Sequence, residues 1–198
     1  MRYLLILFFL ALNFISLAQS KWEKAYDEND LLIHTRTTSD DLFEFKASTV
    51  YNHSVKKILA AIRDYESYPK WNYKTKEFRI IERLNEDEHY SYSIVDFPFP
   101  MKDRDVVMFS STSYPSDNSI LIKMRTEPSK MKKTDYVRMS KIRGFWKLIP
   151  LSTNKTKVVY QIASETNGMP YWLIEMFALE APKGNLRGLK KIVEEKEG

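Results

Sequence analysis

The chain has 198 residues, carries a formal net charge of +5 at pH 7, and is 43% hydrophobic. This composition is typical of one folded domain with a substantial core, and with only 5 Gly and 14% aromatic residues it excludes a disordered or low-complexity chain. The lack of Cys excludes disulfides, lipid-modified cysteines and cysteine metal ligands, and the mild basic excess gives no reason to expect a nucleic-acid partner.

The first 18 residues are typical of a secretory signal peptide. Arg2 supplies a positive charge, Leu4 to Leu17 form an apolar run, and small residues precede a cleavage position at Ala18. An uncleaved membrane anchor is the alternative, but the run is shorter than the ~20 residues that a spanning helix needs. We therefore expect a signal peptide over residues 1–18 and one domain over residues 19–198. Export without Cys indicates a periplasmic or secreted bacterial protein.

Two strands are expected after a short polar lead-in over residues 22–30. Leu31 to Arg36 and Phe43 to Tyr51 are joined through Thr38-Ser-Asp-Asp41, whose residues favour a turn, so the pair predicts a hairpin. Apolar and polar residues alternate along the second strand, which predicts one buried and one solvated face.

The period then changes to that of a helix. Ser54 stands where an N-cap belongs, and apolar residues at helical spacing predict a helix from Val55 to about Asp64. Tyr65 to Trp71 predicts a second, short helical turn broken at Pro69.

From Tyr73 onward the period returns to two, and six meandering strands are expected. Their positions are Phe78 to Ile81, Tyr90 to Ile94, Asp103 to Tyr114, Ile120 to Arg125, Tyr136 to Leu148 and Lys157 to Ser164.

A C-terminal helix is expected to begin at Pro170, because proline lacks only an N–H that would be unpaired there. Pro182 interrupts the apolar pattern and predicts a kinked or broken helix. The apolar residues of its first half are Trp172, Met176 and Leu179 at helical spacing, with Leu173, Phe177 and Ala181 beside them. Those expected to face inward in its second half are Leu186, Leu189, Ile192 and Val193.

This order of elements predicts an α+β fold, in which an antiparallel sheet carries helices on one side. A long antiparallel sheet twists and curls, so its concave side must be filled by the helices or by a ligand. The inward-facing candidates are rich in aromatic residues and Met, which suit a pocket lining as well as a core. Periodicity alone favours the solid core, with the pocket as the alternative.

Five stretches of the chain are distinctive in combination. They are Asp64-Tyr-Glu-Ser-Tyr-Pro-Lys-Trp71, Asp96-Phe-Pro-Phe-Pro-Met-Lys-Asp-Arg-Asp105, Val137-Arg138, Gly144-Phe-Trp-Lys-Leu-Ile-Pro150 and Asn167-Gly-Met-Pro-Tyr-Trp-Leu173. In order and spacing they resemble the START domain family, the lipid-transfer domains related to steroidogenic acute regulatory protein. The likeness runs from about Trp22 to Val193. The chain departs from it in lacking the long N-terminal helix of eukaryotic members and in having Asn167-Gly168 where a glycine pair is usual.

The resemblance implies a helix-grip fold, in which a curved antiparallel β-sheet wraps around a long C-terminal α-helix. It implies that one lipid or sterol-like molecule is bound in an internal tunnel, with transfer of that molecule as a further role, and with no chemistry and no cofactor. We expect the helix and the loop from Phe97 to Lys102 to gate this tunnel. The expected protein is a monomer that contacts a membrane only transiently.

Ten residues are candidates for contact with the ligand. Arg104 and Arg138 either pair with a carboxylate or bind a head group, because a buried arginine needs a partner. Trp146 and Trp172 are placed on the tunnel wall by the resemblance, and core packing is their alternative. The remaining candidates are Trp71, Tyr92, Met124, Tyr160, Met176 and Phe177.

The sequence offers little for catalysis. His34, His53 and His89 lie far apart, with no acid or Ser at the spacing of a metal site or a catalytic triad. The main alternative to a binding protein is an enzyme of the same fold, of cyclase or hydrolase type, which would bring titratable residues together in the pocket. A structural or protein-binding module is the third, and it would have a filled interior and an exposed apolar patch.

Overall fold

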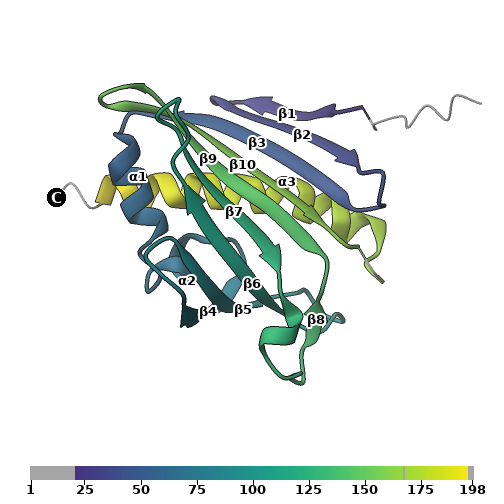
Figure 1. The fold of residues 1–198 in the computed structure, drawn as a ribbon. Coiled ribbons are helices and arrows are strands. Elements are labelled where there is room, and N and C mark those ends of the chain that lie inside the picture. Colours follow the sequence, from purple (N-terminus) through teal and green to yellow (C-terminus); the bar gives the residue numbers. More distant parts are fainter. Residues whose placement is uncertain (1–20, 167, 196–198) are drawn as a thin grey trace, which may run out of the picture.

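The computed structural model describes residues 21–166 and 168–195, in which a large curved sheet holds a long helix against its inner face (Figure 1). The strand order is β1-β2-β3-β10-β9-β7-β6-β5-β4, with β8 paired to β6. All pairs are antiparallel except β6 with β8. The predicted α+β helix-grip fold is therefore confirmed. The strands are β1 Glu23–Glu28, β2 Leu31–Thr37, β3 Phe43–Tyr51, β4 Thr75–Arg83, β5 Glu88–Val95, β6 Arg104–Ser113, β7 Ile120–Thr126, β8 Val137–Met139, β9 Ile142–Ser152 and β10 Lys155–Ser164.

The helices are α1 Val55–Ile62, α2 Tyr68–Trp71 and α3 Tyr171–Glu195, with a 3₁₀ turn, η1, at Pro128–Lys130. The helix and hairpin expected near the N-terminus are confirmed. Ser54 caps α1, because its hydroxyl accepts a hydrogen bond from the Lys57 N–H at 3.4 Å. In the turn between β2 and β3, Asp41 adopts a φ of 59° and the Thr38 N–H donates to the Leu42 carbonyl at 2.8 Å.

The polar lead-in expected over residues 22–30 is wrong, because its centre forms strand β1 at the edge of the sheet. Five of its six residues are exposed, so the strand has no apolar alternation that a sequence pattern could reveal. Its half-buried residue is Tyr26, whose ring lies under Lys183 of α3 at 4.1 Å.

Two further boundaries differ from expectation. Pro69 lies in the first turn of α2 and starts that helix rather than breaking it. The single strand expected from Tyr136 to Leu148 is split into β8 and β9. Since β8 turns away to pair in parallel with the start of β6, the chain bends before it enters β9.

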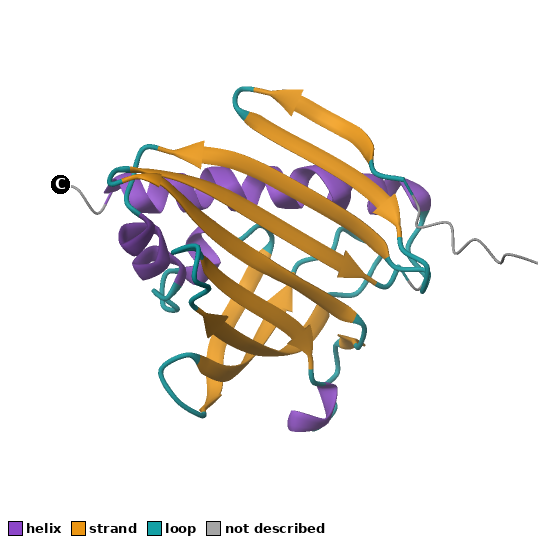
Figure 2. Cartoon of the chain, turned by 45° about the horizontal axis from the view of Figure 1, so that its top comes forward, coloured by secondary structure: helices purple, strands orange, loops and turns teal. Residues whose placement is uncertain are grey.

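The break expected at Pro182 is also absent, since α3 runs unbroken through it. Proline removes one helical N–H but does not end a helix that packing holds on both sides of it. Pro182 is itself buried, between Ala178 and Asn185 on the same face. Figure 2 shows α3 lying behind the strands along the length of the sheet.

The core fills one end of the space between the sheet and the helices. The second half of α3 contributes buried residues to it as expected, namely Leu186, Leu189 and Val193. Ile58 and Ala61 of α1 meet them there, together with residues of β2, β3, β9 and β10. No residue of the first half of α3 belongs to this cluster. The two halves of one helix therefore have different surroundings.

Candidate ligand-binding cavity

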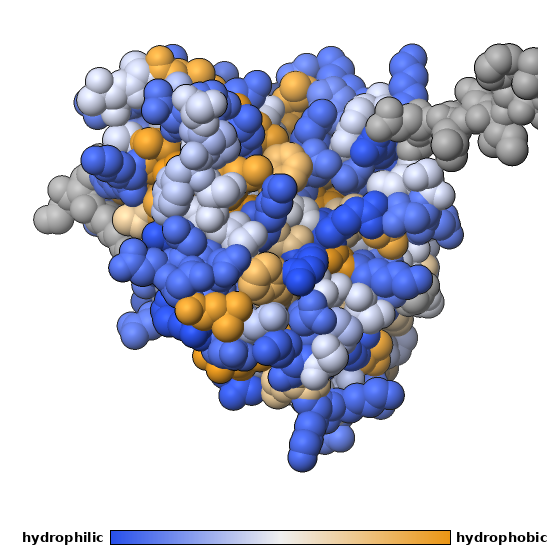
Figure 3. Space-filling model, viewed as in Figure 1, coloured by the Kyte–Doolittle hydropathy of each residue, from blue (hydrophilic) through white to orange (hydrophobic). Residues whose placement is uncertain are grey.

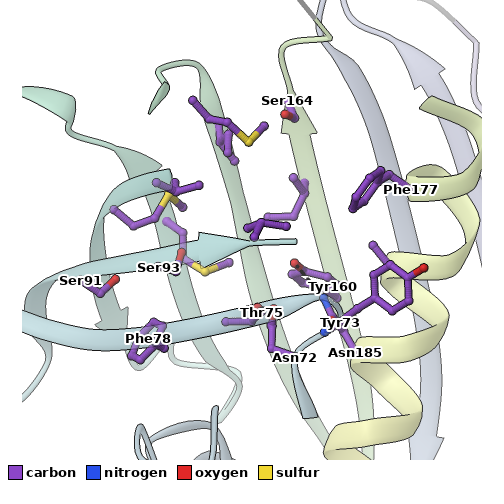
Figure 4. Close-up of a pocket in the computed structure, with 18 of the residues that line it drawn as sticks. Asn72, Tyr73, Thr75, Phe78, Ser91, Ser93, Tyr160, Ser164, Phe177 and Asn185 are labelled. Carbon is purple, nitrogen blue, oxygen red and sulfur yellow. Dashed lines mark hydrogen bonds between the residues drawn. The ribbon is translucent and has the colours of Figure 1, made fainter. Parts of the chain in front are cut away.

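A cavity of about 250 Å³ lies between the concave face of the sheet and the first half of α3 (Figure 4). Its walls come from strands β3 to β10, from α1 and α2 and the segment that follows them, and from α3. The outer face of the sheet, seen in Figure 3, is mostly polar with scattered apolar positions. The apolar surface therefore gathers on the inner side, where a curled sheet leaves room.

The first half of α3 turns a mixed stripe of large and small residues toward this cavity. The stripe consists of Ile174, Phe177, Ala178 and Ala181, at spacings of three and four residues, and Asn185 continues it into the second half. The two alanines face the sheet with only a methyl group each. Space therefore remains beneath the helix where larger side chains would have filled it.

Aromatic rings form the opposite wall, on β9, β10 and β3. Trp146 stacks on Tyr160 with ring centroids 4.0 Å apart, and Phe45 meets Tyr160 edge-on at 5.3 Å. Because β9 and β10 pair Trp146 directly with Tyr160, both side chains stand on the same face of the sheet. They form a rigid apolar floor.

One end of the cavity is closed by contacts between α3 and the loop from Phe97 to Lys102. The Phe97 ring stacks on the Phe177 ring, with centroids 4.7 Å apart. The Phe97 N–H donates to a carboxylate oxygen of Asp103 at 3.1 Å, which holds the start of the loop. Farther along the loop the Phe99 side chain is 94% exposed. The closure thus includes the stacked rings of Phe97 and Phe177, and Phe177 also meets the Tyr73 ring edge-on at 6.1 Å.

The other end of the lid is fastened by Asn185. Its side-chain oxygen accepts the Tyr73 N–H at 2.6 Å, and its amide donates to the Tyr160 hydroxyl at 3.4 Å. Figure 4 shows Asn185 on α3 close to Tyr73 and Tyr160. The Tyr51 hydroxyl also donates to the Leu186 carbonyl. Asn185 therefore marks the point where α3 passes from the cavity to the core.

The cavity has polar groups on the walls contributed by β5 and β6. His89 and Ser91 of β5 and Ser110 of β6 are buried and line it. Burial lowers the pKa of His89 to about 4, and the charges of Arg83 and Arg63 act in the same direction. At neutral pH the imidazole is therefore uncharged.

Four of the ten candidate residues line the cavity, namely Met124, Trp146, Tyr160 and Phe177. Trp71 is buried instead in the core, packed edge-on against Trp146 at 6.2 Å. Tyr92 is buried on the other face of β5, in a small cluster with Ile94 and Val107. The strand phase expected for β5 is therefore inverted.

Arg138 lies in a structural ion pair outside the cavity lining. Its Nε and Nη2 donate to the two carboxylate oxygens of Asp105 at 2.7 and 2.8 Å, and this pairing raises the pKa of Arg138. Arg104 is also buried outside the lining, with its guanidinium 4.8 Å from the Phe97 ring centroid. Burial lowers the pKa of Arg104.

The helical phase expected for the first half of α3 is also shifted. Trp172 is 52% exposed and Met176 is half-buried, and neither lines the cavity. The face that turns inward is the one through Phe177, a single residue farther along the helix. Because both faces of this half carry large apolar residues, their spacing did not distinguish the inner from the outer face.

Several lining residues were not among the candidates. Tyr65 and Tyr68 come from the segment around α2, and Tyr68 stacks on Phe78 at 4.1 Å. The lining side chains on β5, such as Ser91, alternate with tyrosines and had the appearance of a solvated face. For the serine positions, the sequence does contain a signal. Ser occurs on both of two neighbouring strands, as Ser91 of β5 and Ser110 of β6.

Within residues 21–166 and 168–195, no group of three or more acidic or His side chains is arranged to hold a metal ion. None of the helices in this part of the chain is long and apolar enough to cross a membrane.

Comparisons with known proteins bear on this fold and cavity. The sequence model of the family described as START domain matches residues 12–183. An uncharacterized protein of Pseudomonas aeruginosa, PA1579, is 27% identical over 178 residues, which cover 88% of each chain. The solved STAR-related lipid transfer protein of Xanthomonas axonopodis superposes with a TM-score of 0.79 at 23% identity, covering 87% of this chain and 98% of that one. Human StAR-related lipid transfer protein 5 gives a TM-score of 0.77 at 16% identity, covering 89% and 88%.

A more distant solved structure is an aromatase/cyclase, Zhui from Streptomyces sp. R1128. It superposes with a TM-score of 0.51 at 12% identity, covering 79% of this chain and 94% of that one. Identities at this level show a shared fold, and one fold can hold both binding proteins and enzymes.

Proposed function

The chain belongs to the START domain family, and from that membership we propose that it binds one hydrophobic ligand, a lipid or sterol-like molecule, in the cavity beneath α3. The observation that carries the proposal is the cavity of about 250 Å³ under Phe177 and Ala181. A helix that only completed a core would have its inward residues packed against the sheet, as Leu189 is. Burial of an apolar ligand at roughly 25 cal/mol per Å² would supply the driving force.

The ligand passes, in this proposal, between the first half of α3 and the loop from Phe97 to Lys102. The stacked pair of Phe97 and Phe177 is the contact that must open. Asn185 and the residues after it keep their contacts meanwhile, so the helix can tilt without leaving the core. Such motions of a lid anchored at one end are a common route of access to closed sites.

The same end of the molecule is where a transient contact with a membrane would occur. Phe99, Tyr171 and Trp172 are exposed there by 94%, 74% and 52%. Glu175 raises the pKa of the Tyr171 hydroxyl, and Glu23 of β1 lies close enough to Tyr171 of α3 for its negative charge to raise that pKa further. The start of β1 is therefore near the start of α3. Exposed aromatic side chains favour the boundary between water and lipid. A ligand leaving the cavity there would pass directly into lipid, as transfer requires.

The predicted signal peptide, residues 1–18, lies outside the described residues. We keep it as part of the proposal, with a mature domain over residues 19–198 that acts as a monomer in the periplasm or outside a bacterial cell. N-terminal sequencing of the protein from its host would test the cleavage near Ala18.

An enzyme of the same fold is the second candidate, since the aromatase/cyclase from Streptomyces shares this architecture. His89 is the titratable group that an enzyme would be expected to use here. Its ring contacts Tyr65 at 5.0 Å, and its nitrogens make no hydrogen bond within the described part of the chain. A general base needs an orienting partner, so this surrounding favours binding over catalysis.

Uptake of the neutral fluorescent probe N-phenyl-1-naphthylamine tests the proposed function, because the probe brightens on entering an apolar site. We expect the wild type to bind it and Ala181→Phe, which fills the cavity from α3, to bind at least roughly tenfold more weakly. The matched control is Ala60→Phe on the exposed side of α1, which should bind like wild type. Equal binding by both variants would show that the probe sits elsewhere and would contradict the proposal.

A further inference from the structure

The inner walls of β5 and β6 carry a compact polar patch formed by His89, Ser91 and Ser110. His89 and Ser110 are direct partners across the two strands, and Ser91 stands two residues from His89 on the same face. Neighbours at such positions are close enough for all three side chains to meet one small group. Figure 4 shows Ser91 on the wall away from α3.

All three side chains of this patch are more than nine-tenths buried, with 8%, 4% and 7% exposed for His89, Ser91 and Ser110. None of them makes a side-chain hydrogen bond to any residue in the described ranges 21–166 and 168–195. Buried polar groups are nearly always hydrogen-bonded, and leaving one unmet costs free energy. Within the described residues the fully buried side-chain atom without a partner is Trp71 Nε1, so the polar atoms of the three side chains keep surface that faces the cavity, where a polar group of the ligand can bond to them.

The charges around the patch are already compensated. Arg63, which lines the cavity, donates to Asp87 at 2.5 Å and to the Tyr114 hydroxyl at 3.2 Å. Arg83 is exposed to solvent and lies 5.2 Å from the centroid of the Tyr65 ring. The imidazole of His89 is itself uncharged at neutral pH. A charged head group would lose its hydration here without gaining an unpaired counter-charge.

Toward its other end the cavity has a mostly apolar lining that also includes Ser164, Glu165 and Thr166, and the buried Glu165 carboxylate accepts the N–H groups of Ser140 and Lys141 at 2.5 and 3.1 Å. Val95, Phe97, Met139, Ile142, Ile174 and Phe177 line it near the loop from Phe97 to Lys102. Along β5 the lining changes from His89, Ser91 and Ser93 to Val95. The inner end of the cavity is thus polar and uncharged, whereas the outer end combines apolar side chains with a carboxylate that backbone N–H groups already bond.

We propose that the ligand is an amphiphile with an uncharged head group, whose hydroxyl or carbonyl groups bond to His89, Ser91 and Ser110 while its apolar chain points toward Phe97 and Phe177. This rests on the proposed function, since it specifies the ligand of the same cavity. Glycerides and long-chain alcohols have this chemistry. Free carboxylates and quaternary ammonium lipids do not.

Displacement of bound N-phenyl-1-naphthylamine by three amphiphiles with the same twelve-carbon chain tests the inference. The competitors are monododecanoylglycerol, dodecanoate at pH 8 and dodecyltrimethylammonium, which are neutral, anionic and cationic. We expect the neutral compound to displace the probe at a concentration at least roughly tenfold below either charged one. The double variant Ser91→Ala/Ser110→Ala should weaken the neutral compound about tenfold relative to the two charged ones, each competitor being compared after correction for that variant's own affinity for the probe.

The control variant is Ser111→Ala, which changes the neighbouring residue on the outer face of β6 and should behave like wild type. Circular dichroism confirms that each variant is folded. Displacement by a charged competitor as strong as by the neutral one, or a double variant that competes like wild type, would overturn the head-group assignment while the proposed function stands. Failure of the wild type to bind the probe at all would overturn both.

Discussion

The two halves of α3 share one helix but differ in what lies beneath them. The half from Lys183 to Glu195 packs Leu186, Leu189 and Val193 into the core. The half from Tyr171 to Pro182 covers the cavity with Phe177 and smaller residues. One helix can therefore be an anchor at its C-terminal end and a lid at its N-terminal end. The lid half can move while the anchor half keeps the fold intact.

Two glycines show how closely the anchor half approaches its neighbours. A Cβ atom at Gly188 would lie 2.4 Å from the Trp71 carbonyl oxygen, and one at Gly184 would lie 2.7 Å from the Tyr73 ring. The helix thus touches the backbone of Trp71 at Gly188 and the side chain of Tyr73 at Gly184. The lid half instead places Ala178 and Ala181 next to the cavity, and its fully buried leucine is Leu173.

A covalent bridge between the lid half of α3 and the loop from Phe97 to Lys102 should have the largest effect, which is the loss of ligand uptake. Phe97→Cys/Phe177→Cys places the only two thiols of the chain at positions whose rings stack at 4.7 Å. Bridged by a short bis-methanethiosulfonate, this variant should no longer take up N-phenyl-1-naphthylamine on the timescale of the assay, and dithiothreitol should restore uptake. Uptake that is equally fast with and without the bridge would show that α3 and the loop do not form the gate.

Replacing one leucine by alanine in each half should lower the free energy of unfolding more in the anchor half than in the lid half. Leu189→Ala should lower the free energy of unfolding by about 3 kcal/mol, because Leu189 is fully buried in the core. Leu179→Ala, at a half-buried position of the lid half, should cost about 1 kcal/mol. Urea unfolding measures both. Equal losses would mean that Leu179 is packed as tightly as Leu189.

Lowering the pH should destabilise the protein through His89, which lines the cavity. Its folded pKa of about 4 lies below the ordinary value of 6.5, so between these pH values the unfolded chain binds a proton that the folded chain does not. Stability should therefore fall as the pH is lowered from 6.5 to 4, by roughly 2 to 3 kcal/mol from this group. His89→Gln should remove that part of the pH dependence in urea unfolding. A wild-type slope in the variant would assign the effect to other groups.

Adding one methyl group to the anchor is the mildest of these tests. Gly188→Ala should destabilise the protein by about 2 kcal/mol, because the new Cβ collides with the backbone of Trp71. The control is Lys190→Ala on the exposed side of the same helix, which should change the free energy of unfolding by less than about 0.5 kcal/mol. A thermal midpoint for Gly188→Ala as high as for the control would show that α3 can shift away from α2 there.

The sequence predicted the elements that follow a simple period and failed where a strand faces a cavity. The hairpin of β2 and β3 was recognised because its apolar residues alternate and one face is buried. Strand β5 was placed with its tyrosines inward, whereas Ser91 faces the cavity and Tyr92 lies on the opposite face. An amphipathic pattern identifies the apolar face of a strand, which is usually the buried one. On β5 the inward face carries polar residues because it lines a cavity, so the pattern identifies the wrong face.

The C-terminal helix illustrates the same limit in a different way. Its anchor half was placed correctly, because Leu189 and Val193 alternate with exposed Lys and Glu. Its lid half carries Trp172 and Met176 on one side and Phe177 on the other, so hydrophobicity could not set the phase. Arg138 could not be assigned from sequence either, because its partner Asp105 is 33 residues away and its position depends on the pairing of β8 with β6.

The most direct test of the central claim is native mass spectrometry of the protein purified from its own host without detergent. The account predicts a species heavier than the polypeptide by one small hydrophobic molecule, which is released on denaturation and recovered in the organic phase of an extraction. Ala181→Phe should lack that species. A bare polypeptide mass for the wild type, both as purified and after incubation with the host's extracted lipids, would contradict the claim that the space beneath α3 is a binding site.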